Sequence, residues 1–321
     1  MSTETVSGAL KRARNGVGVS GSGRAPGGTK KRGKAVKFTG TFLAFALPSV
    51  VLLLLLNFYP VIYAGWQSLH FGDLVNAGPF VWFQNYASVL TSAQFWTAAL
   101  FTLVFTVVGV FGSWAVGLGL ALLLRTRIPL NGMWKVLLLL PWVVPTVVSA
   151  TSWNWLVATP QSPLPVLAHA LGFGNVLFLA DPTLARVTVC IFKVWISFPF
   201  MMMMMSSALA SVDTNVYEAS RVDGANAWQT FTRITLPMVS RTTYVSWILM
   251  TIFCVNDFPT IFLLTAGGPS NATQTLVVQA YSSVFQNNQV GPGVATAFLM
   301  TIVLVIVSVV LYRQIQKVNI E

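Results

Sequence analysis

Charged and amide side chains inside long apolar runs are the residues of this sequence that are best placed to bind a solute. Asp257 follows Asn256 in the run 240–265, and Lys193 lies in the run 185–209. A carboxylate among apolar side chains is costly unless it faces a partner or water, so Asp257 predicts a functional site. It could hydrogen-bond a solute, line a gate or tether a neighbouring helix. Lys193 could contact an anionic solute or pair with Asp257, and we favour a structural or gating ion pair.

Aromatic residues accompany these polar groups. Trp153 and Asn154 lie near the end of the run 132–157, and Trp195 lies in the run 185–209. An indole beside an amide could stack on a sugar ring while the amide bonds its hydroxyl groups. The alternative is an aromatic belt at a membrane interface. Arg186 lies at the end of its run, where its long side chain could reach water.

Nothing in the sequence predicts covalent catalysis. The two histidines, His70 and His169, are far apart, and no cluster of His, Cys and carboxylate residues has metal-ligand spacing. Cys190 and Cys254 both lie in apolar runs, which favours packing over a disulfide. We therefore expect no cofactor in this chain and a source of energy in another polypeptide.

The elements that must position these residues are membrane-spanning helices. The chain is 55% hydrophobic and only 8% charged, which excludes an ordinary soluble domain. Runs near or above the ~20 residues needed to cross a bilayer predict an all-α integral membrane protein with six spans. The runs are about 39–66, 96–124, 132–157, 185–209, 240–265 and 291–312. Pro141, Pro145, Pro199 and Pro259 predict irregular or interrupted helices.

The basic residues set the predicted orientation. The net charge of +11 does not indicate nucleic-acid binding, because much of it lies in the Gly- and Ser-rich residues 1–38, a predicted disordered tail. The connections 125–135 and 210–241 and the C-terminus also carry Lys or Arg, whereas 67–95, 158–184 and 266–290 carry none. The positive-inside rule therefore places both termini in the cytoplasm and the three connections without Lys or Arg outside.

A polar hinge separates the fourth and fifth runs. The letters E-A-S-R-V-D-G-A occupy 218–225, and I-T-L-P occupies 234–237. The pattern predicts two short helices joined at Gly224, which can leave the helical region. Asn215 and Glu218 are a predicted capping pair for the first helix. Pro237 suits the first turn of the following helix.

This hinge resembles the EAA coupling loop of ATP-binding-cassette (ABC) importer permeases, in its letters and in the spacing from Glu218 through Gly224 to Ile234. Ser220 stands where that family has Ala. The segment 83–86, F-Q-N-Y, and the segment 264–269, L-T-A-G-G-P, with Thr273 and Leu276 beyond it, resemble the carbohydrate-uptake branch related to maltose transport. The glycine that the branch has near 83–86 is absent. The resemblance extends from about residue 41 to the C-terminus.

The resemblance implies a type I ABC importer permease fold over 39–321 in the cytoplasmic membrane, with a coupling loop at about 211–237. It implies that this loop contacts an ATPase and that ATP and Mg²⁺ are bound by the ATPase chains. The implied partners are a second permease, two ATPase subunits, an external solute-binding (lipo)protein and membrane lipid. The coupling residues implied are Glu218, Ala219, Ser220, Asp223, Gly224 and Pro237, and the predicted pathway residues are Trp153, Asn154, Lys193, Trp195, Asn256 and Asp257.

Other interpretations remain open at this point. A secondary transporter or channel driven by an ion gradient would need repeats or a chain of intramembrane acids, and only Asp257 qualifies. An integral membrane enzyme would need a catalytic set. For the solute, few ionisable groups and many aromatics favour a neutral sugar, from mono- to oligosaccharide, whereas Lys193 leaves a glycerol- or sugar-phosphate open.

Overall fold

The computed structural model describes residues 40–126 and 128–318 and divides the chain into two compact units, 1–54 and 55–321. The predicted tail, 1–38, lies outside the described residues. Helices dominate the described part, where a single antiparallel bridge, between His70 and Phe80, is the β-type pairing found. The predicted all-α class is confirmed.

The helices follow one another along the chain with short connections. In the first unit, the helix is α1 (Gly40–Leu53). The remaining α-helices are α2 (Tyr59–Ser68), α3 (Gln84–Thr91), α4 (Ala93–Val107), α5 (Ser113–Arg125), α6 (Asn131–Val143), α7 (Thr146–Val157), α8 (Pro163–Ala170), α9 (Pro182–Ala210), α10 (Thr214–Val222), α11 (Ala227–Thr230), α12 (Leu236–Val255), α13 (Phe258–Leu264), α14 (Leu276–Tyr281) and α15 (Val290–Val318). Four π-helical segments are η1 (Leu54–Phe58), η2 (Val108–Gly112), η3 (Phe231–Thr235) and η4 (Ser282–Gln286).

Within the described ranges, five helical stretches are long and apolar enough to cross a membrane. They are Phe45–Ser68, Ala93–Arg125, Pro182–Ala210, Ala227–Val255 and Val290–Gln316. In a lipid environment a helix satisfies every backbone polar group internally, which is why such apolar runs form helices. A bent pair, α6 with α7, supplies a sixth span if it is counted as one.

The predicted run 132–157 is not a straight helix. It forms α6 and α7, which meet at an angle of 91°. Val144 and Pro145, with ψ of 132° and 134°, are extended at the break. Proline has no N–H to donate and pushes the preceding residue out of the helical region, so Pro145 explains the bend. By contrast, Pro141 and Pro199 lie inside α6 and α9 without ending them.

Helix α9 lies at the centre of the second unit and packs against α5, α6 and α12. It begins at Asp181, whose carboxylate accepts hydrogen bonds from the N–H groups of Thr183 and Leu184. The contact with α5 is close because Gly117 has no side chain: a Cβ there would lie 2.7 Å from the backbone N of Met202. Small residues at such crossings allow helices to approach in membranes.

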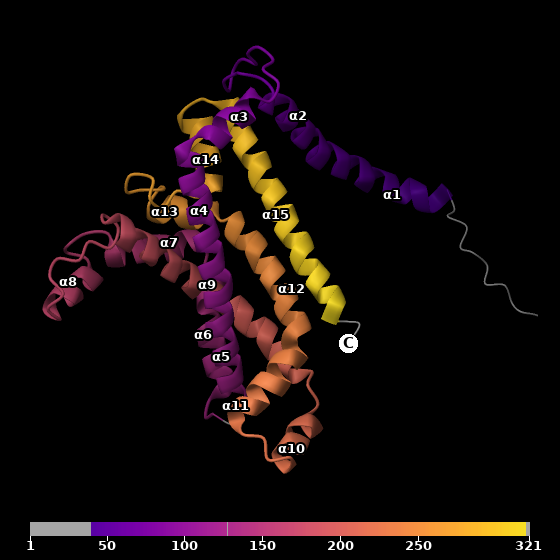
Figure 1. The fold of residues 1–321 in the computed structure, drawn as a ribbon, viewed down its shortest axis with the longest axis vertical. Coiled ribbons are helices and arrows are strands. Elements are labelled where there is room, and N and C mark those ends of the chain that lie inside the picture. Colours follow the sequence, from indigo (N-terminus) through magenta and orange to yellow (C-terminus); the bar gives the residue numbers. More distant parts are fainter. Residues whose placement is uncertain (1–39, 127, 319–321) are drawn as a thin grey trace, which may run out of the picture. The chain divides into compact units, whose positions relative to one another are not determined.

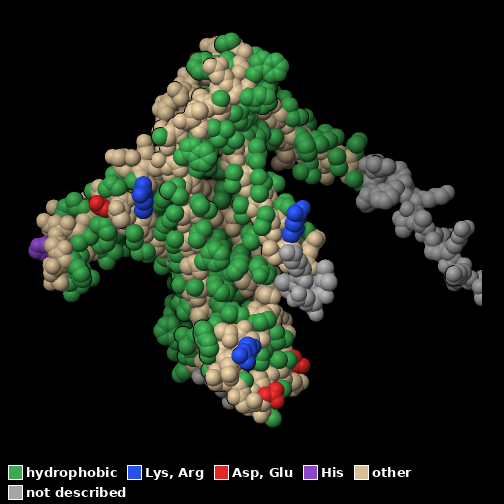
Figure 2. Space-filling view, in the orientation of Figure 1, with side chains coloured by type: hydrophobic (Ala, Val, Ile, Leu, Met, Phe, Trp, Pro, Cys, Tyr) green, Lys and Arg blue, Asp and Glu red, His purple; other side chains and the backbone are tan. Residues whose placement is uncertain are grey.

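The hinge and two of the predicted external connections, 67–95 and 266–290, lie at opposite ends of the second unit, whereas the third, 158–184, carries α8 at its side (Figure 1). Figure 1 shows α10 and α11 at one end, and α3 and α14 at the other. The visible face is mostly hydrophobic, with acidic and basic side chains at the end that carries α10 (Figure 2).

Candidate functional site

The predicted hinge forms two short helices, but a different residue begins the first. The N-cap of α10 is Asp213, whose Oδ1 accepts from the backbone N of Asn215 at 2.9 Å. The predicted capping pair of Asn215 with Glu218 is therefore wrong. Asn215 already lies in the first turn, whereas the Asp213 side chain, one residue before the helix, can reach a free N–H group.

Gly224 ends α10 as predicted. Its φ is +77°, the left-handed region that favours glycine. The N–H of Ala225 bonds to the carbonyl of Ser220 at 2.9 Å, and that of Gly224 bonds to the carbonyl of Arg221 at 3.1 Å. These bonds satisfy carbonyl groups that the end of a helix leaves free, so the turn is a helix-terminating motif rather than a loose loop.

The second helix begins with a feature that the sequence reading missed. Asn226 and Gln229 form a reciprocal capping box, in which each side-chain oxygen accepts from the other residue's N–H at 2.9 Å. The spacing of an amide three residues before a glutamine was the signal that could have found it. Helix α11 then continues through η3 into α12, and Pro237 is in the first turn of α12.

The predicted coupling residues divide into exposed and buried positions. Glu218, Ala219, Asp223, Gly224 and Pro237 are exposed. Ser220 is buried, and its Oγ donates to the carbonyl of Tyr217 at 2.8 Å. Large apolar side chains are also exposed on the hinge, at Val222 and Trp228. The hinge thus presents a surface with both apolar and acidic groups.

Lys193 and Asp257 meet inside the helix bundle. The Nζ atom of Lys193, on α9, lies 2.6 Å from Oδ2 of Asp257, and the two residues are only 5% and 9% exposed. Asp257 also accepts from the backbone N and the Oγ1 of Thr260, at 3.1 and 2.8 Å. The carboxylate therefore caps α13 while it pairs with α9. The pairing that the sequence favoured is present in the structure.

The chain is interrupted at this pair. Helix α12 ends at Val255 and α13 begins at Phe258, so the predicted run 240–265 is two helices. Gly109 of η2 lies against the same site, because a Cβ there would be 2.8 Å from Cys254 Sγ and 3.1 Å from Lys193 Cγ. Both cysteines are free and buried, which confirms that they do not pair with each other.

Of the other predicted pathway residues, the two tryptophans lie close together, whereas the two asparagines make separate contacts. The rings of Trp153 and Trp195 are 5.5 Å apart, and both pack on Phe192. Asn154 Nδ2 donates to the carbonyl of Leu264, at the end of α13, at 3.2 Å. Asn256 is exposed and bonds only its own helix, at the carbonyl of Ile252.

Arg186 is tied down rather than free to meet a solute. Its Nε donates to the carbonyl of Ala272 at 2.8 Å, and its guanidinium carbon lies 6.0 Å from the ring centre of Phe101. The bond joins α9 to the connection after α13. Arg186 therefore fixes a connection in place, which the sequence alone did not indicate.

Two motifs in the predicted external connections hold those connections in place. Asn85 Nδ2 donates to the carbonyls of Ser68 and His70, at 2.8 and 3.0 Å. Thr273 Oγ1 donates to the carbonyl of Gly268 at 2.7 Å. Asn85 thus ties α3 to the end of α2, whereas Thr273 closes a local turn.

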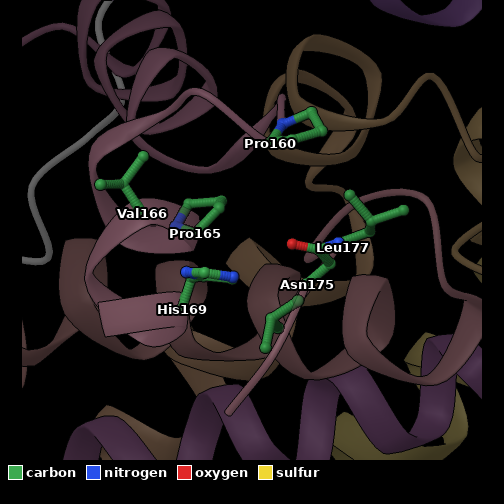
Figure 3. Close-up of a pocket in the computed structure, with 7 residues that line it drawn as sticks. Pro160, Pro165, Val166, His169, Asn175 and Leu177 are labelled. Atoms are coloured by element: carbon green, nitrogen blue, oxygen red, sulfur yellow. The ribbon is translucent and has the colours of Figure 1, made fainter. Parts of the chain in front are cut away.

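A small cavity of about 250 Å³ lies beside α8, between that helix and the segment 175–177. Figure 3 shows His169 with Pro165 and Val166 on one wall and Asn175 with Leu177 on the other. His169 is the titratable residue among those that line it. Without a second acid, base or nucleophile there, the cavity has no set of groups for catalysis.

Comparison with known proteins gives the family. Residues 26–319 match the model of the family described as "Binding-protein-dependent transport system inner membrane component". The trehalose/maltose transport system permease protein MalF of Thermococcus litoralis is 32% identical over 272 residues, which cover 84% of this chain and 92% of that protein. The trehalose transport system permease protein SugA of Mycobacterium tuberculosis is 32% identical over 263 residues, 80% of this chain and 83% of that protein.

Solved structures share the fold. A chain of a bacterial ABC transporter involved in the import of the acidic polysaccharide alginate superposes with a TM-score of 0.75 at 20% identity, covering 87% of this chain and 96% of that one. This likeness confirms the type I ABC permease fold. The match over nearly the whole chain, with the apolar helices, establishes that this protein is an integral membrane component belonging to the binding-protein-dependent transport system permease family.

Proposed function

We propose that this chain is the permease subunit of an ATP-driven importer that moves a neutral sugar, from mono- to oligosaccharide, across the cytoplasmic membrane. The observation that carries the proposal is the hinge 211–237, because its geometry and the family membership of the chain both support this function. Its two helices have capped ends, and its coupling residues Glu218, Ala219, Asp223 and Gly224 are exposed at one end of the unit.

The covalent path from the hinge leads directly to the buried ion pair. Helix α11 passes through η3 into α12 without a break, and α12 ends beside Asp257. A push on the hinge by a closing ATPase would therefore act along α12 on the carboxylate that caps α13 and pairs with Lys193. Arg125, at the end of α5, lies 4.4 Å above the ring of Tyr217 and links the hinge to a second span.

A sugar fits the chemistry of the bundle better than a phosphorylated solute. Lys193 is engaged by Asp257, and Arg186 is engaged by a backbone carbonyl, so neither side chain stands ready for a phosphate. Two of the relatives are permeases named for trehalose and trehalose/maltose transport, and they are the relatives that support an uncharged sugar. A glycerol- or sugar-phosphate, and a gradient-driven transporter, are the less favoured alternatives, the latter because Asp257 is the sole acid in its apolar run.

The partners follow from the same proposal. They are a second permease, two ATPase subunits that hold ATP and Mg²⁺, and an external solute-binding protein that docks on the connections 67–95, 158–184 and 266–290. In the proposed orientation, both termini and the hinge lie in the cytoplasm. In the same orientation, α3 and α14 lie on the outer side, where the binding protein would release the solute.

The direct test is purification of the chain from its native membrane in mild detergent, with uptake measured in parallel. Co-purification of an ATPase and a second permease, with loss of labelled trehalose or maltose uptake when this chain is deleted, is the expected result. A chain that purifies alone, and whose deletion leaves uptake of both sugars intact, would overturn the proposal.

A further inference from the structure

A second, larger cavity lies at the end of the unit that carries α3 and α14. Its volume is about 560 Å³, within the ~300–1,000 Å³ range of small-molecule sites. Five segments meet around it: the connection after α2, the α3–α4 junction, the connection after α13, the segment from α14 through η4, and the start of α15. This cavity is separate from the Lys193–Asp257 pair, because neither residue lines it.

The lining is strongly polar but uncharged. Seven of its side chains are amides and five carry hydroxyl groups, and no Asp, Glu, Lys, Arg or His is among them. An amide offers both donors and acceptors, and a hydroxyl does the same, so the lining complements a ligand that is rich in hydroxyl groups. An ion would find no opposite charge here, which argues against a phosphate or carboxylate ligand.

Two of the amides are buried, and one of them is held by a hydrogen bond. Gln274 is 5% exposed, and its Oε1 accepts from Gln94 Nε2 at 2.9 Å. This bond joins residues 180 positions apart and fixes one wall of the cavity. Gln279, on α14, is 8% exposed, and its Oε1 has no hydrogen-bond partner within the described part of the chain. A buried amide without a partner is unusual and points to a ligand or water that would complete it.

The lining also includes an aromatic side chain. The ring of Phe71 is exposed and belongs to the lining. An aromatic face beside a ring of amides is suited to a pyranose, whose C–H face is apolar and whose edge carries hydroxyl groups. The backbone that positions Phe71 is fixed, because its N–H donates to the carbonyl of Pro79 at 2.9 Å.

We propose that this cavity is a binding site for an uncharged saccharide, occupied before the solute enters the bundle. The proposal rests on the function proposed above, which places α3 and α14 on the outer side. The named contacts are Gln94, Gln274 and Gln279 for the hydroxyl groups and Phe71 for the ring face.

The test is protection of a cysteine in the cavity wall, in the complete transporter in right-side-out membrane vesicles. Ser283 lines the cavity and is half-buried, so Ser283→Cys introduces a reactive group of similar size. The native Cys190 and Cys254 are buried and give little background with a membrane-impermeant maleimide. Trehalose and maltose are the probes, at about 10 mM, and a site with a Kd of about 1 mM would slow labelling roughly tenfold.

Two controls separate specific protection from general effects. Asn175→Cys, exposed beside α8 and outside this cavity, should label at the same rate with and without sugar. Glucose 6-phosphate should protect Ser283→Cys weakly, because no cation lines the cavity.

Adding Gln279→Met, which removes the amide at nearly constant length, should abolish protection by the disaccharides. If Ser283→Cys does not assemble, Ser88→Cys on another wall takes its place.

The outcomes distinguish this proposal from the one it rests on. Unchanged labelling with both disaccharides, in vesicles that do import them, overturns the cavity and leaves the importer standing. Protection by the sugar-free binding protein alone assigns the cavity to protein docking and also overturns the proposal. Protection by sugar in a chain that lacks ATPase partners supports the cavity while it overturns the importer.

Discussion

The Nζ atom of Lys193 lies 2.6 Å from Oδ2 of Asp257, although 64 residues separate the two along the chain. The same carboxylate accepts two bonds from Thr260 and so caps α13. One side chain thus joins α9 to the break between α12 and α13. Because α12 leads back to the hinge, this pair is the point where movement of the hinge would reach the centre of the bundle.

Asp257→Asn should destabilise the protein strongly. The amide can still cap α13, but it leaves the Lys193 ammonium buried without a counter-charge, a change that costs about 3–5 kcal/mol in buried pairs. The expected result is a clear fall in the melting temperature of the detergent-purified complex. Glu218→Gln, the same carboxylate-to-amide change at an exposed position, should leave the melting temperature unchanged.

The double variant Lys193→Met, Asp257→Asn tests whether charge or shape is responsible. It removes both charges together, so most of the lost stability should return. If the single and double variants melt at the same temperature, the pair contributes packing and not electrostatic compensation, and the role assigned to it here is wrong.

Gly224→Ala should impair coupling without unfolding the protein. A Cβ at this position meets nothing within 4 Å, so the cost is the backbone strain of φ +77°, about 1–2 kcal/mol. The expected result is normal abundance in the membrane with reduced uptake of the sugar and reduced ATPase stimulation. Gly224→Asp should reduce them further, because it adds a charge to the exposed surface beside Asp223.

Gly172→Ala is the matched control for this strain. Its φ is +87°, a Cβ there would also meet nothing within 4 Å, and it lies after α8, far along the chain from the hinge. Equal loss of uptake in both variants would mean that backbone strain alone is responsible. In that case the hinge at Gly224 would have no special part in coupling.

Glu218→Lys should abolish ATP-driven uptake while the chain stays in the membrane. Glu218 is exposed and forms no ion pair among the described residues, so the reversal acts on a partner surface and not on this fold. Co-purification of the ATPase subunits should fall in parallel. Asn175→Lys, which places the same charge on an exposed residue beside α8, should leave co-purification of the ATPase subunits unchanged. Wild-type uptake with Glu218→Lys would remove the hinge from the mechanism.

Ser220→Ala should be well tolerated. The side chain is buried on the inner side of α10, and its hydroxyl donates only to the carbonyl of Tyr217 in its own helix. Losing such a bond costs about 1 kcal/mol or less, and alanine fills the same space. Uptake within about twofold of the wild type is expected, whereas Ser220→Leu should lower both abundance and uptake because it overfills the contact.

The sequence predicted the hinge well because its signals are local. A glycine that must adopt positive φ and a proline at a helix start act within a few residues, and both lie where they were expected. The error at Asn215 has the same local origin: three polar residues, Asp213, Thr214 and Asn215, stand together, and any of them could cap α10. Because α10 begins at Thr214, the N-cap position is that of Asp213.

The ion pair could be predicted for a different reason. Lys193 and Asp257 are opposite charges in apolar runs, and burial of one charge requires the other. The polar cavity could not be predicted in this way. Gln94 and Gln274 carry no charge that demands a partner, so their convergence depends on how five segments pack. The bend at Val144 was indicated by Pro145, but its angle depends on the surrounding helices.

Gly109→Val should disrupt the centre of the bundle. The added carbon atoms would collide with Cys254 Sγ, 2.8 Å from the Cβ position, and with Lys193 Cγ at 3.1 Å. Overfilling a packed interior costs about 1–3 kcal/mol, and here it would also push Lys193 away from Asp257. Gly119→Val, in the same span, meets nothing within 4 Å and serves as the control. We expect Gly109→Val to lower both the melting temperature and uptake, while Gly119→Val changes neither; equal behaviour of the two variants would show that the close approach of η2 to the ion pair is not needed.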